Sequence, residues 1–538
     1  MRSPQEFVSE YGDRTGARLA SIYRLSLAWY VFGITVLASL GIEPIYQHVT
    51  PFYAQYFPAS SFATPNILPL FVAVLAYGIV HRVLGIRLLR PIRLGFAICG
   101  VLGIAFLTAV SDVTYRGTDL SGFWTGFKWH LPALCVVIIF SVIIVLFFRR
   151  IRWWDVELSN KAAWRAVFGL IVFAFVSSGS IAMIREGTDG IAAAYSRTGY
   201  EYIDDIGKGL TLSGFLRDYN ELHPMLSMHA KVHPPGPVVM LWVMSKILLS
   251  RDPLVLSIGT MAVGSMTLLP LFAWVRDMLN QRVALTCCAF FALAPSIVLF
   301  TATSADIMFL PLVVLTLLCF WRAIHRGSIT YACGAGVLYA FMSLTSFSLL
   351  SLGAFFAWVG LWRMQDLAFR GNVIKTAVLM LAAFLAAHGA VYGLTGFNII
   401  TCFELSHAQF QEDQSQLDIT SPRYGPWAFK LLNPLCWIYF VGIPATVLWC
   451  WRMIKLEHVS RPLFIVFALT LLVLAPLYLA RGEGERSAMY IFPFIIVPAA
   501  HLLDELGQRA QSFRPMAATF LFLVFQTWLT ETLLYTYW

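Results

Sequence analysis

Long apolar runs recur along the chain, and they constrain its fold more than any other feature. The runs are about 16 to 23 residues long, close to the ~20 residues that a helix needs to cross the hydrocarbon core of a bilayer. Residues 377–394 are apolar on nearly every face, with His388 as the only ionisable group. Strands of a membrane barrel would be shorter and would alternate in polarity. With 59% hydrophobic and 12% charged residues and a mean hydropathy of +0.72, the sequence predicts an all-α, polytopic membrane protein.

The apolar runs predict about fifteen transmembrane helices. Residues 238–249 are mostly apolar but too few to span, so we expect this segment to lie in the membrane interface. The predicted helices are near 25–42, 67–81, 94–111, 131–148, 166–184, 254–275, 283–303, 307–321, 329–345, 347–362, 376–395, 430–451, 462–480, 487–503 and 515–534.

The distribution of Lys and Arg predicts the orientation of these helices. With 238–249 not spanning, twelve Lys and Arg residues after residue 253 fall on one side, against Arg423, Lys430, Arg481 and Arg486 on the other. Because cytoplasmic loops are enriched in Lys and Arg, the N-terminus is predicted to be cytoplasmic and the C-terminus to face outward. The net charge of +9 is thereby explained by topology, and no nucleic-acid partner is expected. The polar first twenty residues and the first apolar run predict an uncleaved helix rather than a signal peptide.

The same orientation brings four polar segments to the outer side. They are residues 185–253, 303–306, 396–429 and 481–486. We expect these segments to converge on one site, which both a lipid-borne and a water-borne substrate could reach.

The acidic residues of these segments are candidates for acid-base chemistry. Asp204 and Asp205 stand side by side in the large loop, and Asp306 lies in the short turn between two helices. Transfer of a sugar from a phosphate-linked donor requires a base for the acceptor hydroxyl, and an aspartate suits that role. Adjacent aspartates are also common in solvated turns. Asp306 has an alternative role as the N-cap of the following helix.

Basic residues of the same segments are candidates for binding a lipid phosphate. Arg481 and Arg486 carry planar guanidinium groups that match phosphate oxygens, with Glu485 beside them. Their alternative role is that of interfacial anchors paired with neighbouring glutamates. Lys231 and His233 stand just before a Pro-Pro-Gly-Pro segment and could also contact phosphate.

No metal or nucleotide site is predicted. His223, His229 and His233 lack an HExxH arrangement or a cysteine partner, so we expect them to form hydrogen bonds within the loop rather than to bind zinc. Gly-rich phosphate loops and dinucleotide fingerprints are absent at recognisable spacing. We therefore expect no cofactor and no requirement for a divalent cation, although a carboxylate-bound cation stays an alternative.

The order of these motifs resembles the GT-C glycosyltransferases of the protein O-mannosyltransferase and aminoarabinose-transferase kind, over about residues 161–538. The resemblance rests on the paired acids followed by His-Pro-Pro, the interfacial helix, the turn with Asp306 and the late Gly-Glu-x-Glu-Arg segment, and it is greatest to bacterial members with the His-Pro-Pro-Gly variant. It implies a GT-C fold and a polyprenyl-phosphate-linked sugar donor. The reaction would invert the anomeric centre without a metal ion.

The resemblance also implies residue roles. Asp205 or Asp204 would be the base, although Asp-Asp stands where the family has Asp-Glu; Asp306 would match the acid of the next outward turn. Lys231 and His233 would match positions beside the Pro-Pro, and Arg486 the late arginine near the lipid phosphate. The lysine that some relatives carry after the ninth helix is absent, because residues 344–348 read Leu-Thr-Ser-Phe-Ser.

The chain therefore divides into residues 1–160, an N-terminal extension of four predicted helices with no recognisable motif, and residues 161–538, the predicted GT-C core with its catalytic outward loop at 185–253. The favoured function is an outward-facing glycosyltransferase of a bacterial plasma membrane, with a glycan, lipid or protein as acceptor. The alternatives are a transporter or lipid flippase, which would carry ionisable residues at mid-membrane, and a non-catalytic assembly subunit.

Overall fold

The computed structural model describes residues 157–196, 199–420, 426–454, 460–477 and 484–535, together with isolated positions between 116 and 153. The predicted helices near 25–42, 67–81 and 94–111, and most of that near 131–148, lie outside the described residues. So does nearly all of the predicted 1–160 extension. Every predicted helix after residue 160 coincides with helix in the structure.

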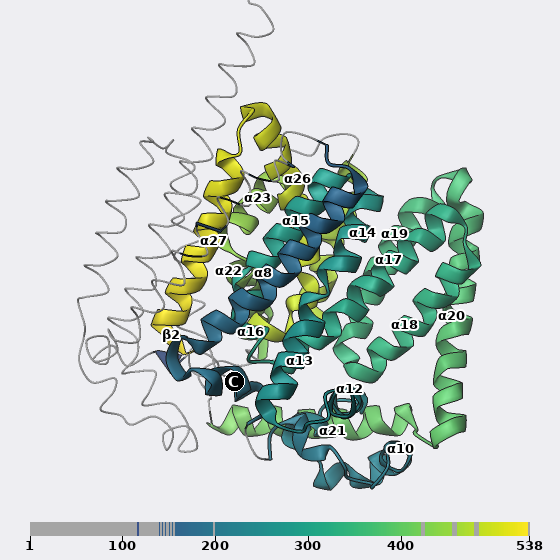
Figure 1. Ribbon diagram of the computed structural model, residues 1–538. Helices are drawn as coiled ribbons and strands as arrows, with labels where there is room; N and C mark the ends of the chain where they lie inside the picture. Colours follow the sequence, from purple (N-terminus) through teal and green to yellow (C-terminus); the bar gives the residue numbers. More distant parts are fainter. Residues whose placement is uncertain are drawn as a thin grey trace, which may run out of the picture.

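Most helices form one bundle (Figure 1). Its members are α8 (Asn160–Glu186), α13 (Pro253–Ser265), α14 (Leu268–Met278), α15 (Gln281–Leu293), α16 (Pro295–Phe300), α17 (Leu310–Arg326), α18 (Ile329–Thr345), α19 (Gly353–Met364), α20 (Leu367–Thr395), α22 (Pro426–Phe440), α23 (Ile443–Ile454), α24 (Arg461–Leu477), α26 (Pro493–Ala510) and α27 (Arg514–Leu533).

Short helices connect and cover these elements. They are α9 (Thr188–Ala192), η2 (Ala193–Tyr195), η3 (Tyr202–Asp205), α10 (Leu212–Leu222), η4 (His223–Met225), α11 (Met228–Lys231), α12 (Gly236–Ile247), η5 (Ala305–Phe309), η6 (Phe347–Leu352), α25 (Gly484–Ser487) and η7 (Met489–Ile491), with the longer α21 (Ile399–Thr420). Two-residue strands, β1 (Arg116–Gly117) and β2 (Leu534–Tyr535), pair antiparallel and are a small exception to the all-helical prediction.

Five described segments are long and apolar enough to cross a membrane. They are Asn160–Met183, Pro253–Met278, Ala305–Arg326, Phe347–Met364 and Leu367–Thr395, and a bent pair, Gly484–Ile491 with Pro493–Ala510, makes a sixth. The last of the five has a mean hydropathy of 1.9, yet only 6% of its most apolar window is buried in the protein. An apolar helix left uncovered to this degree is compatible with a lipid surrounding. The protein is thus a helical membrane protein, and the total of about fifteen spans stays a prediction.

Local sequence signals divide one predicted span into two helices and join two others in a hairpin. The run predicted at 283–303 divides into α15 and α16 because Ala294, which precedes Pro295, adopts ψ 129° instead of helical values. Helices α17 and α18 form a tight hairpin, in which Gly327 takes a left-handed φ of 62° and the Ser328 side chain accepts from Tyr331 N.

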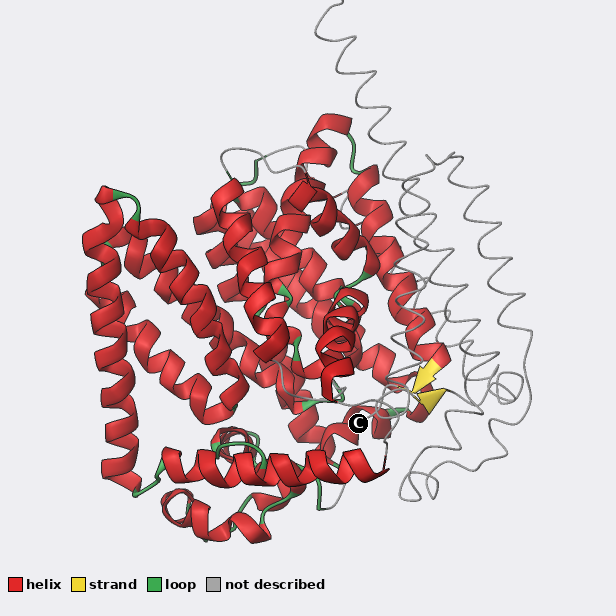
Figure 2. Ribbon diagram, turned by 180° about the vertical axis from the view of Figure 1, so that it is seen from behind, coloured by secondary structure: helices red, strands yellow, loops and turns green. Residues whose placement is uncertain are grey.

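Helices α10, α12 and α21 lie across one end of the bundle, which we name the loop end (Figures 1 and 2). Helix α12 is seen end-on in both views, whereas α21 runs crosswise beneath the bundle. The prediction that residues 238–249 do not run as a span is in keeping with α12, which has 12 residues and lies across the bundle. Helix α21, in contrast, occupies the predicted 396–429 loop and was not predicted.

Candidate active site

The loop between α8 and α12 is folded around buried tyrosines at the loop end. The side chain of Tyr219 is fully buried, and its hydroxyl donates to the carbonyl oxygens of Ala230 and His233, both at 2.9 Å. These bonds join α10 to the segment that leads into α12. Helix α10 also holds α21, because Asn220 Nδ2 donates to Asn398 O at 3.0 Å. The loop is therefore an ordered cap and not a solvated connection.

Asp205 lies inside this cap. Its side chain is 0% exposed, and its carboxylate accepts from the backbone N of Ser227 at 3.1 and 3.2 Å and from Ser227 Oγ at 2.7 Å. Lys208 Nζ completes the enclosure at 2.5 Å from Asp205 Oδ1. A carboxylate with this many donors links η3 to the start of α11, and this arrangement restrains the loop.

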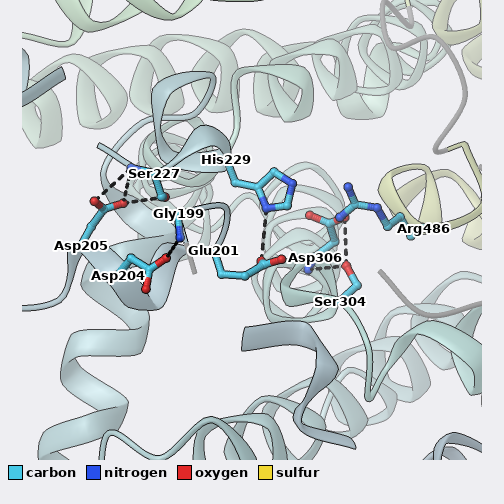
Figure 3. A network of polar contacts seen from close by, with 9 residues as sticks. All are labelled: Gly199, Glu201, Asp204, Asp205, Ser227, His229, Ser304, Asp306 and Arg486. Carbon is cyan, nitrogen blue, oxygen red and sulfur yellow. Dashed lines mark hydrogen bonds and ion pairs between the residues drawn. The ribbon is translucent and has the colours of Figure 1, made fainter. Parts of the chain in front are cut away.

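Asp204 lies in the same short helix but points elsewhere. It is half-buried, and its Oδ2 accepts from the backbone N of Gly199 at 2.5 Å. Figure 3 shows both aspartates on the opposite side of Glu201 and His229 from Asp306 and Arg486. The predicted acidic pair is therefore not brought together with the two other predicted site residues.

Asp306 and Arg486 are brought together, although 180 positions separate them in the chain. Arg486 Nη1 donates to Asp306 Oδ2 at 3.3 Å, and Ser304 Oγ donates to the same oxygen at 3.1 Å. The side chains are 14% and 10% exposed. The expected convergence of the 303–306 and 481–486 segments is confirmed for this pair. The N-cap role suggested for Asp306 belongs to Ser304, whose Oγ accepts from Asp306 N.

Glu201 is a site residue that the sequence analysis missed. It is 4% exposed, and its Oε2 lies 3.2 Å from Nδ1 of His229. In Figure 3 the Glu201 carboxylate and the His229 ring lie between the two aspartates of η3 on one side and Asp306 with Arg486 on the other. The available signal was a third carboxylate in the same short polar stretch, three residues before Asp204.

Tyr202 connects Glu201 with the Asp306 and Arg486 pair. Burial is the main cause that raises the pKa of Tyr202 well above its usual value; the negative charge of Asp306 raises it further, Arg486 lowers it, and Glu201 raises it again. Tyr195 is also buried and has a raised pKa, to which Glu201 and Asp306 contribute after burial. Both phenols therefore stay protonated. The charges of Asp306, Arg486 and Glu201 all act on Tyr202, and Figure 3 shows the Glu201 carboxylate on the side of Asp306.

The two remaining basic candidates of the loop, His233 and Lys231, have different neighbours. The ring of His233 lies 6.0 Å from that of Tyr202, and the ring of His229 lies 5.8 Å from it. Lys231 ends α11, and its charge helps to lower the pKa of Asp413 on α21, which burial raises. His233 is thus near Tyr202, whereas the charge of Lys231 acts on α21.

Glu485 and Arg481 are the last predicted site residues. Glu485 is 0% exposed; its backbone O accepts from Ser296 Oγ, and its Oε2 lies 3.7 Å from Cys436 Sγ. This carboxylate faces α22 inside the bundle. Arg481 lies outside the described residues.

Two of the three loop histidines form hydrogen bonds within the loop, as the sequence predicted. His223 Nε2 lies 2.9 Å from Lys231 O, and His229 is paired with Glu201; both bonds are internal to the loop, so this expectation is confirmed for them. Within the described ranges no group of three or more His, Cys, Asp or Glu side chains is arranged to hold a metal ion. We therefore assign no residue to a cation.

One comparison with known proteins bears on this site. Residues 232–389 match the model of the dolichyl-phosphate-mannose-protein mannosyltransferase family. The match covers less than a third of the chain, and it includes α12 and the turn with Asp306. No curated protein matches the chain significantly. The family match and the apolar helices together support a membrane glycosyltransferase of the GT-C type, with a glycosyl donor and an acceptor such as a protein or glycan.

Proposed function

We propose that the protein transfers a sugar from a polyprenyl-phosphate donor to an acceptor hydroxyl at the outer face of a bacterial plasma membrane, with inversion of the anomeric centre. The observation that supports this function best is the contact of Asp306 with Arg486 beside Glu201 and Tyr202. A carboxylate base and a guanidinium for a departing phosphate are the two groups that the reaction needs. They lie at the loop end, where crossing helices would meet the lipid surface.

The reaction follows from these groups. The acceptor oxygen attacks the anomeric carbon while its proton passes to a carboxylate, and the bond from that carbon to the phosphate oxygen breaks. The electron pair of this bond remains on the polyprenyl phosphate, whose growing charge Arg486 stabilises, with His233 as a further contact. Lys231, whose charge acts on Asp413 of α21, is not assigned to the phosphate. Asp306 orients Arg486 through the bond at 3.3 Å. The products are the glycosylated acceptor and polyprenyl phosphate, without a metal ion.

The base is the finer point of this proposal. The sequence analysis assigned it to Asp205 or Asp204. We propose Glu201 instead, because its carboxylate lies on the side of Asp306 and Arg486 in Figure 3, whereas that of Asp205 is enclosed by Ser227 and Lys208. His229 beside Glu201 would hold the carboxylate in place. Asp205 would then maintain the loop.

The orientation is proposed from charge. The twelve Lys and Arg residues counted on one side place the loop end outward and the N-terminus in the cytoplasm. The polar segments described at the loop end (185–253, 303–306 and 396–420) are those that this orientation directs outward.

The proposed function is tested by donor cleavage. The purified protein in nanodiscs is given radiolabelled polyprenyl-phosphate mannose, glucose or arabinose, and the release of polyprenyl phosphate is measured, which needs no knowledge of the acceptor beyond a hydroxyl or water. We expect release with at least one donor and none with heat-inactivated protein. Intact donor that crosses a vesicle bilayer without cleavage would instead support the transporter alternative.

A further inference from the structure

A hollow of about 540 Å³ opens beside α12, apart from the site described above. On one side it is lined by Leu210 and Leu212 at the start of α10, and on the other by Val243 and Ile247 of α12. Val243 is 45% exposed and Ile247 is 75% exposed. The hollow therefore lies on a face of α12 that the bundle leaves uncovered and that is largely apolar.

Two cations border the same hollow. Lys246 lies in the last turn of α12 and Arg251 just before α13, and both are exposed. Across the part of the chain that the structure describes, neither forms an ion pair with a carboxylate. The nearby Asp252 caps α13 by accepting from the backbone N of Leu254 and Val255. An apolar hollow with two cations at its rim matches a ligand that carries a phosphate next to hydrocarbon.

Two leucines near the hollow take a backbone conformation that leucine rarely adopts. Leu210 has φ 62° and Leu249 has φ 53°, where glycine or asparagine is the usual residue. Their side chains are 94% and 91% exposed. An exposed leucine side chain is unfavourable in water and favourable in hydrocarbon, so both side chains are suited to insertion into lipid.

We propose that this hollow binds an anionic phospholipid of the surrounding membrane, with its phosphate at Lys246 and Arg251 and its acyl chains against Leu210 and Ile247. A bulk lipid fits better than the sugar donor, because none of Glu201, Asp306 and Arg486 lines the hollow. This inference does not depend on the proposed function.

Lipid at this position would steady the loop. Arg251 Nη1 donates to Ile206 O at 3.4 Å, directly after Asp205. A Cβ added at Gly207 would lie 3.3 Å from Arg251 Nη1, so this stretch of the loop is packed on the arginine. A phosphate that fixes Arg251 thereby also fixes the end of η3.

Lipid competition tests the proposal. The purified protein is incubated with equal amounts of phosphatidylglycerol and phosphatidylcholine, and retained lipid is counted by native mass spectrometry. Wild-type protein is expected to retain phosphatidylglycerol ~10-fold more than phosphatidylcholine, since each of two surface cations favours an anionic lipid. Lys246→Gln with Arg251→Gln is expected to remove this preference. Lys161→Gln, an exposed lysine at the far end of α8, is the matched control and keeps it.

A second variant keeps the test independent of the cations. Leu210→Asn with Leu249→Asn suits the left-handed backbone, so the fold is maintained while total lipid retention falls. Equal retention of the two lipids by wild-type protein overturns the proposal. So does displacement of phosphatidylglycerol by equimolar polyprenyl monophosphate, which would identify a donor site, or by inorganic phosphate, which would identify a site for a free anion.

Discussion

Asp205 and Glu201 lie four positions apart in one loop, yet their carboxylates have different surroundings. The Asp205 oxygens are surrounded by Ser227 and Lys208. The Glu201 carboxylate lies beside His229, and its charge, like that of Asp306, raises the pKa of Tyr202. On this contrast we propose a structural role for the first and a chemical role for the second.

The structural role of Asp205 predicts a loss of stability. Asp205→Asn removes the charge that holds Lys208, whose side chain is 31% exposed, and we expect a cost of roughly 1–3 kcal/mol in the free energy of unfolding, below the full cost of breaking a buried pair. Thermal unfolding in detergent measures it. Asp218→Asn is the control, because the pair of Asp218 with Arg217 is exposed; an equal effect of the two substitutions would contradict the role.

The contact of Asp306 with Arg486 predicts energetic coupling. Removal of either charge leaves the other in a nearly buried position. The double variant Asp306→Asn with Arg486→Gln should therefore be destabilised less than the sum of the two single variants. We expect an interaction free energy of about 0.5–3 kcal/mol in a double-mutant cycle of unfolding. Strict additivity of the two substitutions would argue against the contact.

The site could be predicted from the sequence only in part. Asp306 was found because it lies at the predicted outer end of an apolar run, where an unpaired charge is costly, and Arg486 because its planar guanidinium group matches phosphate oxygens. Glu201 was passed over, since the direction of a side chain in an irregular turn depends on bonds such as that of Gly199 N to Asp204, which no periodicity reveals.

At the scale of elements, the length of the apolar runs predicted the helices of the bundle. It did not predict elements that depend on packing against other helices. Helix α12 was recognised as too short to span. Helix α21 was missed because its sequence is polar, and it is held by α10 through Asn220 and Asn398. The breaks within the predicted spans, as at Ala294, depend on local backbone geometry that a window of apolar residues averages out.

The close packing of α12 on α18 predicts a loss of stability for substitution at one glycine. A Cβ at Gly236 would collide with the carbonyl oxygen of Leu344 on α18, so Gly236→Ala should displace α12 and destabilise the protein by roughly 1–3 kcal/mol. Gly334→Ala in α18 is the matched control, because nothing lies within 4 Å of its added Cβ, and a helical alanine there should be neutral or stabilising. Thermal unfolding of both variants provides the comparison, and a tolerated Gly236→Ala would contradict the close approach.

At the scale of the whole molecule, the loop end gathers segments from residue 199 to residue 487. In the proposed orientation, the helices that cross the bundle end lie along the lipid surface, and the hollow lies beside α12. Under the proposed function, a substrate with a long lipid and a polar head would reach Asp306 and Arg486 from this surface.

This arrangement predicts how the protein responds to chelation. Because the positive charge at the centre comes from Arg486, EDTA should leave the release of polyprenyl phosphate within about twofold of the untreated rate, as expected for electrostatic stabilisation by a side chain. Loss of activity that Mg²⁺ or Mn²⁺ restores would identify a carboxylate-bound cation instead.

The most direct measurement of the central claim compares Glu201→Gln with Asp205→Asn in donor cleavage. Both are assayed in nanodiscs with the polyprenyl-phosphate sugar that the wild-type protein cleaves, and rates are normalised to folded protein. If Glu201 is the base, Glu201→Gln should lower kcat by about 10²–10⁴-fold, while Asp205→Asn retains kcat within about tenfold. The reverse order, or full turnover by Glu201→Gln, would contradict the account.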